Sequence, residues 1–369
     1  MQKKGSGWFR RREWNVLAGA LATAGLALAA SAAGTTAAVA ADSCPGANKT
    51  LHVAFVYSTT SQNPFQEMAD GAMMAAKEDG NTKIQLLAPP SVDGQAEVQM
   101  LQSATATATD GIAWEAVLPD LFLRSLQAVK KAGIPLVAVD NMTPPGVTPD
   151  LLVSNSNFEV GKRLGEAFVD QHPDPHGEVV LGIDIPTLGV LQDRMKGLQS
   201  VLKAKLPDMK VTGPFDARSN SGVTATTQAW QAQVNAHPDA VGFLGVGGPD
   251  GIALPLIKQK SKGKWLAGSA DIPPQALEGV KSGALFALSS PEHFMKGYIA
   301  IHEIIKQART CKPMPHGWWN SGTLLITKSN IDQILQREKS PEDMFAWFKT
   351  HAIEQQLANP PLRKISELN

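Results

Sequence analysis

Few residues in this sequence have the types and spacing that an enzyme requires. Gly245-Val-Gly-Gly-Pro-Asp-Gly251 comes nearest to a dinucleotide-binding motif, but Pro249 and the spacing of its glycines do not fit one. His172-Pro-Asp-Pro-His176 has side chains that bind metals, yet its two prolines add no ligands and favour a solvated loop. No zinc-peptidase, Cys-x-x-Cys, nucleophile-elbow or P-loop pattern occurs. We therefore expect no enzyme, no metal and no cofactor, and interpret the glycines around Gly247 as a wall that a ligand approaches closely.

A polar segment follows the first predicted strand directly. The apolar run 51–57 leads into Ser58 to Gln62, and a helix is predicted to begin with Asn63 as its N-cap and Pro64 in its first turn. In an open parallel sheet, the loops at the carboxyl ends of the strands border the ligand crevice. Residues 58–65 are thus predicted to form one lip of a cleft, with a merely solvated loop as the alternative.

The elements that must position such loops alternate between strands and helices. Runs rich in β-forming residues recur near 51–57, 83–88, 111–116, 135–139, 178–183, 210–215, 241–246, 264–268 and 284–289, and segments with helical periodicity separate most of them. This rhythm predicts an α/β protein with two similar Rossmann-like lobes, each built on a parallel sheet, joined by a hinge. We expect residues 42–154 and 291–327 in the N-terminal lobe, 155–290 in the C-terminal lobe, and 328–369 as a helical tail packed on the body.

The amino-terminal segment 1–41 has the order of an export signal. A basic start precedes an Ala/Leu/Gly-rich stretch and an Ala-x-Ala-like cleavage site near Ala40-Ala41, so a periplasmic protein is predicted. The cluster Arg10-Arg11-Arg12 allows a twin-arginine route as well as the ordinary secretory one. Residues 1–41 hold five of the 34 basic and one of the 34 acidic residues, which leaves a charge of about minus four and argues against a nucleic-acid partner.

The two cysteines, Cys44 and Cys311, lie near opposite ends of the predicted mature chain. An exported protein meets an oxidising compartment, which favours a disulfide between them. Two unrelated buried thiols are the alternative.

Several segments, taken in order, resemble the ribose-type periplasmic sugar-binding proteins of ABC transporters. They are Asn63-Pro-Phe65, 110–120, 132–140, Ser154-Asn-Ser-Asn157, 192–197, 236–239, Asp271-Ile-Pro-Pro274 and Gly297-Tyr298. Each motif is short, but they are collinear from about Leu51 to Thr327.

The resemblance implies a set of ligand-binding residues. Asn63 and Phe65 would line the N-terminal side, where Phe65 offers an apolar face to sugar C–H groups, and Asp140 would accept hydrogen bonds from hydroxyls. Arg194 and Asp271 would act from the other lobe. Two aspartates and an arginine suit a polyol, which presents several donors and acceptors. Phe65 in the core, helix-capping aspartates and a surface Arg194 are the alternatives.

Departures from the ribose-type pattern show that a ribose pocket is not simply inherited. Asn141 stands where the pattern has arginine, and Gly247-Gly248 where it has Asn-Asp. Glu115, in a Trp-Glu pair, stands near a usual Ser or Asn, and it is predicted either to reach the cleft or to be a salt-bridged wall residue. Asn220 and Glu292 are further candidate contacts whose register the sequence leaves open.

The resulting hypothesis is a monomeric solute-binding protein that delivers a sugar or polyol to an ABC permease in the membrane. A periplasmic sensor that presents the same closed shape to a histidine-kinase ectodomain is the alternative. A secreted hydrolase lacks a nucleophile constellation in the sequence.

Overall fold

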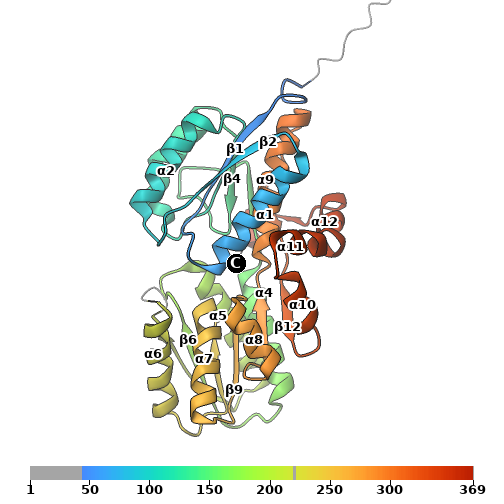
Figure 1. Cartoon of the computed structure of the whole chain (residues 1–369). Coiled ribbons are helices and arrows are strands. Elements are labelled where there is room, and N and C mark those ends of the chain that lie inside the picture. Colours follow the sequence, from blue (N-terminus) through green and yellow to red (C-terminus); the bar gives the residue numbers. More distant parts are fainter. Residues whose placement is uncertain (1–43, 219–221, 369) are drawn as a thin grey trace, which may run out of the picture. The chain divides into compact units, whose positions relative to one another are not determined.

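The computed structural model describes residues 44–218 and 222–368 and divides the chain into units 1–42 and 43–369. The second unit contains two sheets (Figure 1). The first sheet has the order β13-β11-β5-β4-β3-β1-β2, and the second has the order β12-β10-β9-β8-β6-β7. Five consecutive strands therefore follow the same spatial order in both sheets, which confirms the predicted pair of Rossmann-like α/β lobes.

The first lobe is built on seven strands and four main helices. Its strands are β1 Leu51–Val56, β2 Thr82–Leu87, β3 Gly111–Trp114, β4 Leu136–Val139, β5 Leu151–Ser154, β11 Trp318–Asn320 and β13 Leu362–Arg363. Its helices are α1 Asn63–Asp79, α2 Gly94–Thr107, α3 Leu123–Lys131 and α9 His293–Thr310, with a 3-10 turn at Pro119–Phe122. Among the described strands of this sheet, β13 runs antiparallel to its neighbour and the others pair in parallel.

Alternate residues of β1 pack on opposite faces of the first sheet. Val53 and Phe55 join the core formed with α1 and α9, whereas Ala54 and Val56 join the core formed with α2 and α3. This follows from the two-residue period of a strand. A strand buried on both faces must be apolar almost throughout, as the run 51–57 is.

The second lobe repeats this plan. Its strands are β6 Glu178–Ile183, β7 Lys210–Asp216, β8 Gly242–Gly245, β9 Leu266–Ala270, β10 Ala287–Ser290 and β12 Leu324–Thr327. Its helices are α4 Asn157–Gln171, α5 Gly189–Lys205, α6 Val223–Ala236, α7 Gly248–Ser261 and α8 Pro274–Ser282. One core lies against α4 and α5, and the other lies against α6, α7 and α8.

Paired glycines let one helix pair in each lobe approach very closely. A side chain at Gly71 of α1 would lie 2.0 Å from the carbonyl oxygen of Phe294, and one at Gly297 of α9 would lie 1.8 Å from that of Met68. In the second lobe, α4 and α5 meet in the same way through Gly161 and Gly197. This close packing fixes the depth at which the polar residues of α9 and α5 enter the protein.

The tail differs in part from the prediction. It consists of α10 Ile331–Arg337, α11 Pro341–Phe348, a π-helical turn Lys349–Ile353, α12 Glu354–Ala358, β13 and a 3-10 turn Ile365–Glu367. It is largely helical, and it also contains β13, which pairs with β11 of the first sheet.

The strand at 324–327 also lies elsewhere than expected. The sequence placed it in the N-terminal lobe, but β12 pairs antiparallel with β10 at the edge of the second sheet. The chain thus crosses again to the second lobe after β11. Pairing with β12 gives the backbone groups along the open edge of β10 their hydrogen-bond partners.

The first helix also begins differently from the prediction. Gln62, not Asn63, is the N-cap residue of α1, and its side chain makes no capping hydrogen bond. Pro64 does lie in the first turn. The amide oxygen Oδ1 of Asn63 is buried without a hydrogen-bond partner among the described residues.

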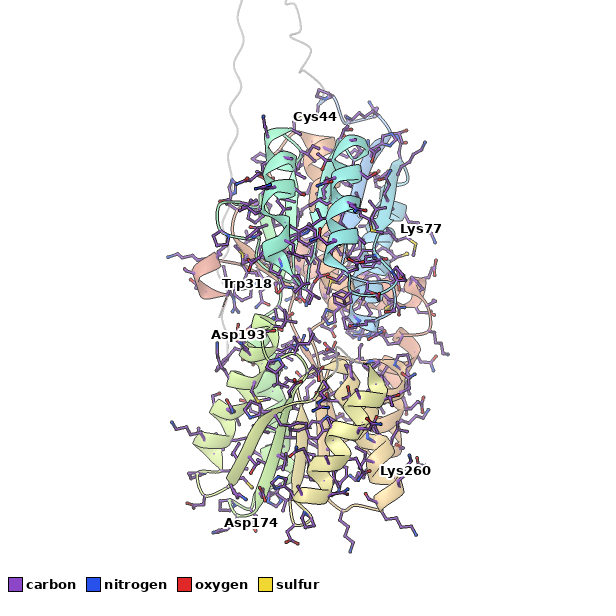
Figure 2. The ribbon with its side chains drawn as sticks, turned by 90° about the vertical axis from the view of Figure 1, so that its left-hand side faces the viewer. Cys44, Lys77, Asp174, Asp193, Lys260 and Trp318 are labelled. Carbon is purple, nitrogen blue, oxygen red and sulfur yellow. A yellow bond between two sulfur atoms is a disulfide. The ribbon has the colours of Figure 1, made fainter. Side chains whose placement is uncertain are left out.

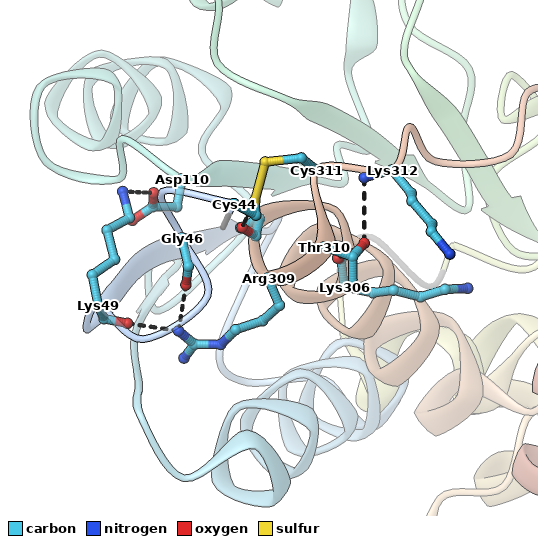
Figure 3. The surroundings of a disulfide bond; sticks show 10 residues. Cys44, Gly46, Lys49, Asp110, Lys306, Arg309, Thr310, Cys311 and Lys312 are labelled. Atoms are coloured by element: carbon cyan, nitrogen blue, oxygen red, sulfur yellow. Dashed lines mark hydrogen bonds and ion pairs between the residues drawn. A yellow bond between two sulfur atoms is a disulfide. The ribbon is translucent and has the colours of Figure 1, made fainter. Parts of the chain in front are cut away.

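Cys44 and Cys311 form a disulfide, with 5.5 Å between their Cα atoms (Figure 3). This bond ties the segment before β1 to the residue that ends α9. Arg309 reinforces the junction because it donates hydrogen bonds to the carbonyl oxygens of Gly46 and Lys49, at 2.8 and 2.6 Å. Among the described residues there is no helix long and apolar enough to cross a membrane.

Candidate functional site

Three acidic residues at or just beyond the ends of strands have an unusual backbone conformation. Asp140 follows β4, Asp271 follows β9 and Glu292 lies two residues beyond β10. Their φ angles are 63°, 60° and 53°, in the left-handed region that costs a residue with a Cβ about 1–2 kcal/mol. Such strain persists only where the surrounding structure imposes it, and it is concentrated at functional sites. All three side chains are buried.

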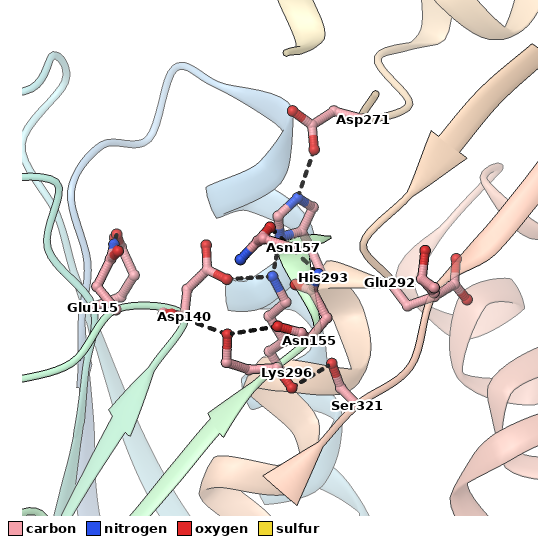
Figure 4. A network of polar contacts seen from close by, with 12 residues as sticks. Glu115, Asp140, Asn155, Asn157, Asp271, Glu292, His293, Lys296 and Ser321 are labelled. Atoms are coloured by element: carbon pink, nitrogen blue, oxygen red, sulfur yellow. Dashed lines mark hydrogen bonds and ion pairs between the residues drawn. The ribbon is translucent and has the colours of Figure 1, made fainter. Parts of the chain in front are cut away.

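A chain of polar contacts connects Asp140 of the first lobe with Asp271 of the second (Figure 4). Lys296 Nζ donates to Asp140 Oδ1, and it lies 3.2 Å from His293 Nδ1. His293 Nε2 lies 3.0 Å from Asp271 Oδ1. His293 and Lys296 are three residues apart, so they share the face of the first turn of α9. The first turn of α9 therefore contacts both strand-end aspartates, Asp140 through Lys296 and Asp271 through His293.

Arg194 extends the path within the second lobe. Its Nη1 donates to Asp271 Oδ2 and to the carbonyl oxygen of Val246, both at 3.0 Å. Its Nε donates to Asn157 Oδ1 at 3.0 Å, and Asn155 Nδ2 lies 3.4 Å from the same oxygen. Arg194 is therefore a buried member of the network, not a surface charge.

The network determines which of its groups are ionised. Burial opposes ionisation of Asp271, but Arg194 and His293 outweigh it, and the pKa of Asp271 is held well below its usual value. Burial likewise raises the pKa of Asp140, and Lys296 more than offsets this. Burial and the neighbouring Lys296 lower the pKa of His293. A neutral imidazole that donates from Nε2 to Asp271 and accepts at Nδ1 from Lys296 satisfies both contacts.

Glu115 lies beside Asp140 at the end of β3 and behaves differently. Burial, and then the charge of Asp140, raise its pKa to about 8, so it is protonated at neutral pH. Its Oε2 accepts from the backbone N–H of Ser58 at 3.1 Å, and Asn141 Nδ2 lies 3.5 Å from its Oε1. Asn141 also donates to the carbonyl oxygen of Ala116 at 3.1 Å. Glu115 is a buried, hydrogen-bonded residue, and it makes no salt bridge with any described residue, contrary to one of the two predictions.

The other candidate residues lie at different depths. Phe65 is buried and joins the core formed by α1 and α9, whereas Asn63 lines a chamber between α1 and α8. Glu292 is buried and paired with Arg337 of the tail, with Oε2 3.1 Å from Nη1. Asn220 lies outside the described residues.

Gly247 is required because a carboxyl group occupies the place of its side chain. A Cβ there would lie 1.4 Å from Oδ2 of Asp184, which follows β6. The backbone N–H of Gly247 donates to Asp250 Oδ2 at 3.2 Å. Burial and the charge of Asp250 raise the pKa of Asp184 well above its usual value. The glycine-rich segment therefore packs against an acidic pair of the protein itself.

Sequence reasoning missed His293, Lys296, Asn155 and Asn157 as members of the network. A signal for the first two is visible, because they are three residues apart in a helical segment, 293–301, whose other residues are Phe, Met, Gly, Tyr, Ile and Ala. Asn155 and Asn157 belong to the motif Ser154-Asn-Ser-Asn157, from which the sequence alone predicts no contact for either side chain. Recognising either pair needs the partner residues, which lie far away in the sequence.

The geometry suits binding of a neutral polar molecule better than catalysis. The network pairs two carboxylates with one ammonium and one guanidinium group, and each carboxylate keeps lone pairs for hydroxyl donors. Within 44–218 and 222–368, no group of three or more His, Cys, Asp or Glu residues has the geometry to hold a metal ion. In the exposed loop that contains both His172 and His176, Asp174 pairs with His176, with 2.9 Å between Oδ1 and Nδ1. This loop lies at the end of the second lobe opposite to Asp193 (Figure 2).

Residues 53–310 match a family model described as a periplasmic binding protein domain. The chain belongs to the periplasmic binding protein family. The match confirms the resemblance seen in the sequence, indicates an extracytoplasmic protein, and assigns the chain to a family of binding proteins, not of enzymes.

Relatives within this family include two curated proteins. The xylose/arabinose-binding protein XylF of Sulfolobus acidocaldarius is 25% identical over 258 residues, which are 64% of this chain and 61% of that protein. The D-apiose import binding protein of Actinobacillus succinogenes is 26% identical over 202 residues, 54% of this chain and 62% of that protein. The matched part thus spans about three-fifths of the length of each relative.

Solved periplasmic binding proteins share the fold. An ABC transporter solute-binding protein from Burkholderia graminis in complex with D-arabinose aligns with a TM-score of 0.69 and 22% identity, covering 77% of this chain and 97% of that one. A protein from Actinobacillus succinogenes with bound D-allose gives a TM-score of 0.69 and 20% identity, covering 77% and 99%. These chains are matched almost completely, whereas nearly a quarter of the present chain lies outside the match.

Proposed function

We propose that this protein is an exported solute-binding protein of an ABC importer that binds a sugar or sugar-like polyol between its two lobes and delivers it to a membrane permease. The observation that carries the proposal is the polar path from Asp140 through Lys296 and His293 to Asp271. It holds hydrogen-bonding groups from both lobes at the carboxyl ends of their strands. Ligands of open α/β sheets bind at such ends.

The charge balance of this path favours an uncharged ligand. Asp140 is paired with Lys296, and Asp271 is paired with Arg194, so the four groups carry no net charge. A charged ligand would have to be buried against an already neutralised network, at a cost of several kcal/mol. A polyol instead donates hydroxyl hydrogens to the remaining carboxylate lone pairs and accepts from the guanidinium group.

The relatives support the same class of ligand. One is named for xylose and arabinose and another for D-apiose, and solved relatives hold D-arabinose and D-allose. We propose a pentose or hexose bound by Asp140, Asp271 and Arg194, with Glu115 and Asn141 forming the wall on the first lobe. The same proposal includes a signal segment at residues 1–41, export by either of the two routes, and a boundary between the lobes at residues 154 and 155.

A ligand held from both lobes favours the closed arrangement over the open one. A ligand shifts such an equilibrium only by its differential affinity for the two states. Bonds to Asp140 and Asp271 together exist only when the lobes are closed, so sugar binding stabilises a closed shape that a permease recognises.

Thermal unfolding of residues 42–369 with a panel of pentoses, hexoses, tetritols and inositols tests the proposal. A sugar at a hundred times its dissociation constant adds about 2.7 kcal/mol of stability and raises the melting temperature measurably. A negative result across the panel contradicts the assignment.

Two variants then test the site for any sugar that binds. We expect Asp271→Asn and Arg194→Ala each to weaken sugar binding at least about tenfold, because a hydrogen bond to a charged group contributes about 1.5–3 kcal/mol. Lys196→Ala is the matched control, since Lys196 is an exposed cation on the same helix as Arg194. Calorimetric affinities that are unchanged in both site variants would refute the assigned contacts.

A further inference from the structure

A chamber of about 340 Å³ lies between α1, α8 and the segment that joins α10 to α11. Figure 1 shows α11 beside α1 and α10 beside α8, which agrees with their contacts. Four acidic residues line it, namely Glu67 and Asp70 of α1, Glu278 of α8 and Glu338 of the tail. Its volume is in the range of small-molecule sites.

Glu67 is the unusual member of this group. Its side chain is only 3% exposed, and its Oε1 has no hydrogen-bond partner among the described residues. A buried carboxyl oxygen without a partner costs about 1–3 kcal/mol, and more when it is charged. Glu67 therefore lines the chamber, and one of its two carboxyl oxygens is buried without a partner among the described residues.

Lys339 lines the chamber and donates through Nζ to Gln336, and the buried cation Arg337 is committed elsewhere. Arg337 donates through Nη1 to Glu292, with a 3.1 Å distance to Oε2, and through Nε to Glu338. Its guanidinium also stacks on Trp347 and Phe348, with its central carbon 4.8 Å from each ring centre. Burial, and then the nearby carboxylate of Glu338, raise the pKa of Glu67 well above its usual value. Burial also raises the pKa of Asp70 to about 6. The four carboxyl groups of the wall outnumber Lys339, the one cation among the described residues that line the chamber.

The rest of the wall includes the apolar side chains of Leu277, Leu335 and Met344, beside the polar residues Asn63, Gln66, Lys339 and Ser340. Carboxylates beside aliphatic side chains suit a molecule with a cationic head and a short hydrocarbon body. A bare metal ion fits less well, since no metal-binding cluster of three such residues occurs in the described part of the chain.

We propose that this chamber is a second binding site, which takes a small aliphatic amine with its ammonium group on Glu67 and its methylene groups against Leu277, Leu335 and Met344. The ammonium supplies the missing donor and places a positive charge among the four carboxyl groups. None of the residues on the polar path from Asp140 to Arg194 lines the chamber, although Asn63, a predicted sugar contact, does. The proposal does not depend on the identity of the sugar.

The chamber is a feature of this chain and not simply of the family fold. Leu335, Glu338 and Met344 belong to the tail, which follows the residues 53–310 that match the family model. The tail contributes to the cores of both lobes, since Ile334 packs in the second and Phe348 in the first. An amine bound here contacts α1, α8 and the tail together.

Isothermal titration calorimetry of residues 42–369 with 1,4-diaminobutane tests the proposal. The neutral control is 1,4-butanediol, which has the same length with hydroxyl groups in place of the ammonium groups. We expect the diamine to bind and the diol not to bind. Glu67→Gln is expected to weaken diamine binding at least tenfold, whereas Glu166→Gln, which removes an exposed carboxylate on α4, leaves it unchanged.

Two further variants decide where the diamine binds. Asp70→Asn removes a second, half-buried carboxylate of the chamber and is expected to weaken diamine binding. This variant keeps the proposal testable if Glu67→Gln folds poorly. Asp271→Asn, in the sugar network, is expected to retain diamine binding. Absence of diamine binding, equal binding in Glu67→Gln, or loss in Asp271→Asn overturns the proposal, and none of these results bears on sugar binding itself.

Discussion

Replacing Lys296 by methionine removes the cation that neutralises Asp140 while it keeps the length of the side chain. Both groups are withdrawn from water, with side-chain exposures of 0% for Lys296 and 9% for Asp140. Removing one partner of a buried ion pair leaves an uncompensated charge, which costs about 3–5 kcal/mol. We expect the free energy of unfolding of Lys296→Met to fall by about this amount.

The loss should depend on pH in a definite direction. In the parent protein the folded-state pKa of Asp140 is lowered, so its contribution to stability is present above the unfolded value of about 3.9 and is lost as the pH falls. In the variant, burial without Lys296 raises the folded-state pKa, and the stability of the protonated form is lost as the pH rises. The difference between parent and variant should therefore be larger at pH 7 than at pH 4.

Urea unfolding followed by tryptophan fluorescence measures these energies. Asp140→Asn combined with Lys296→Met should recover most of the loss, because two neutral groups leave no buried charge. Lys306→Met is the matched control, since this lysine is half-exposed on the same helix and should change stability by no more than about 0.5 kcal/mol. A loss in Lys296→Met no larger than in the control, or no recovery in the double variant, would refute the paired network.

Two other substitutions probe the walls of the cleft. Burial raises the pKa of Glu115 to about 8, so its protonated form stabilises the folded protein fully below about pH 4.3, and this stabilisation is lost as the pH rises toward 8. Glu115→Gln should therefore reduce the decline in stability over this pH range. Urea titrations at several pH values measure the decline, and an unchanged slope contradicts the prediction. Gly247→Ala places a methyl group 1.4 Å from the position of Asp184 Oδ2, so we expect a loss of about 1–3 kcal/mol. Adding Asp184→Ala should restore part of that loss, and a fully tolerated Gly247→Ala would show that the contact is not tight.

Much of the fold could be predicted because its signals are local. The alternation of apolar runs with helical periodicity identified both lobes, and each strand and its following loop carry that information within about ten residues. Asp140 and Asp271 were predicted as candidates because they follow strands in segments that resemble the family. Their left-handed backbone and their buried partners were not predicted, since nothing in the adjoining residues specifies them.

The sequence-based prediction was wrong where a short strand could pair with the edge of either sheet. The segment 324–327 has the composition of a strand, but the sequence does not say which sheet edge it will join. It pairs with β10 of the second lobe, and β13 pairs with β11 of the first, because those edges are the ones left open by the other strands. Glu292 was predicted as a ligand contact, yet Arg337, which lies 45 residues away, pairs with its carboxylate.

The sequence by itself determined the α/β architecture, the two lobes, the family and the strand-end aspartates, because periodicity and short motifs are properties of neighbouring residues. The tertiary structure decided which charges meet. Lys296 reaches Asp140 across 156 residues and Arg194 reaches Asp271 across 77, and the paired glycines of α1 and α9 set the depth of Lys296. Such contacts depend on how helices pack on sheets, and burial then determines which of the contacting groups are charged.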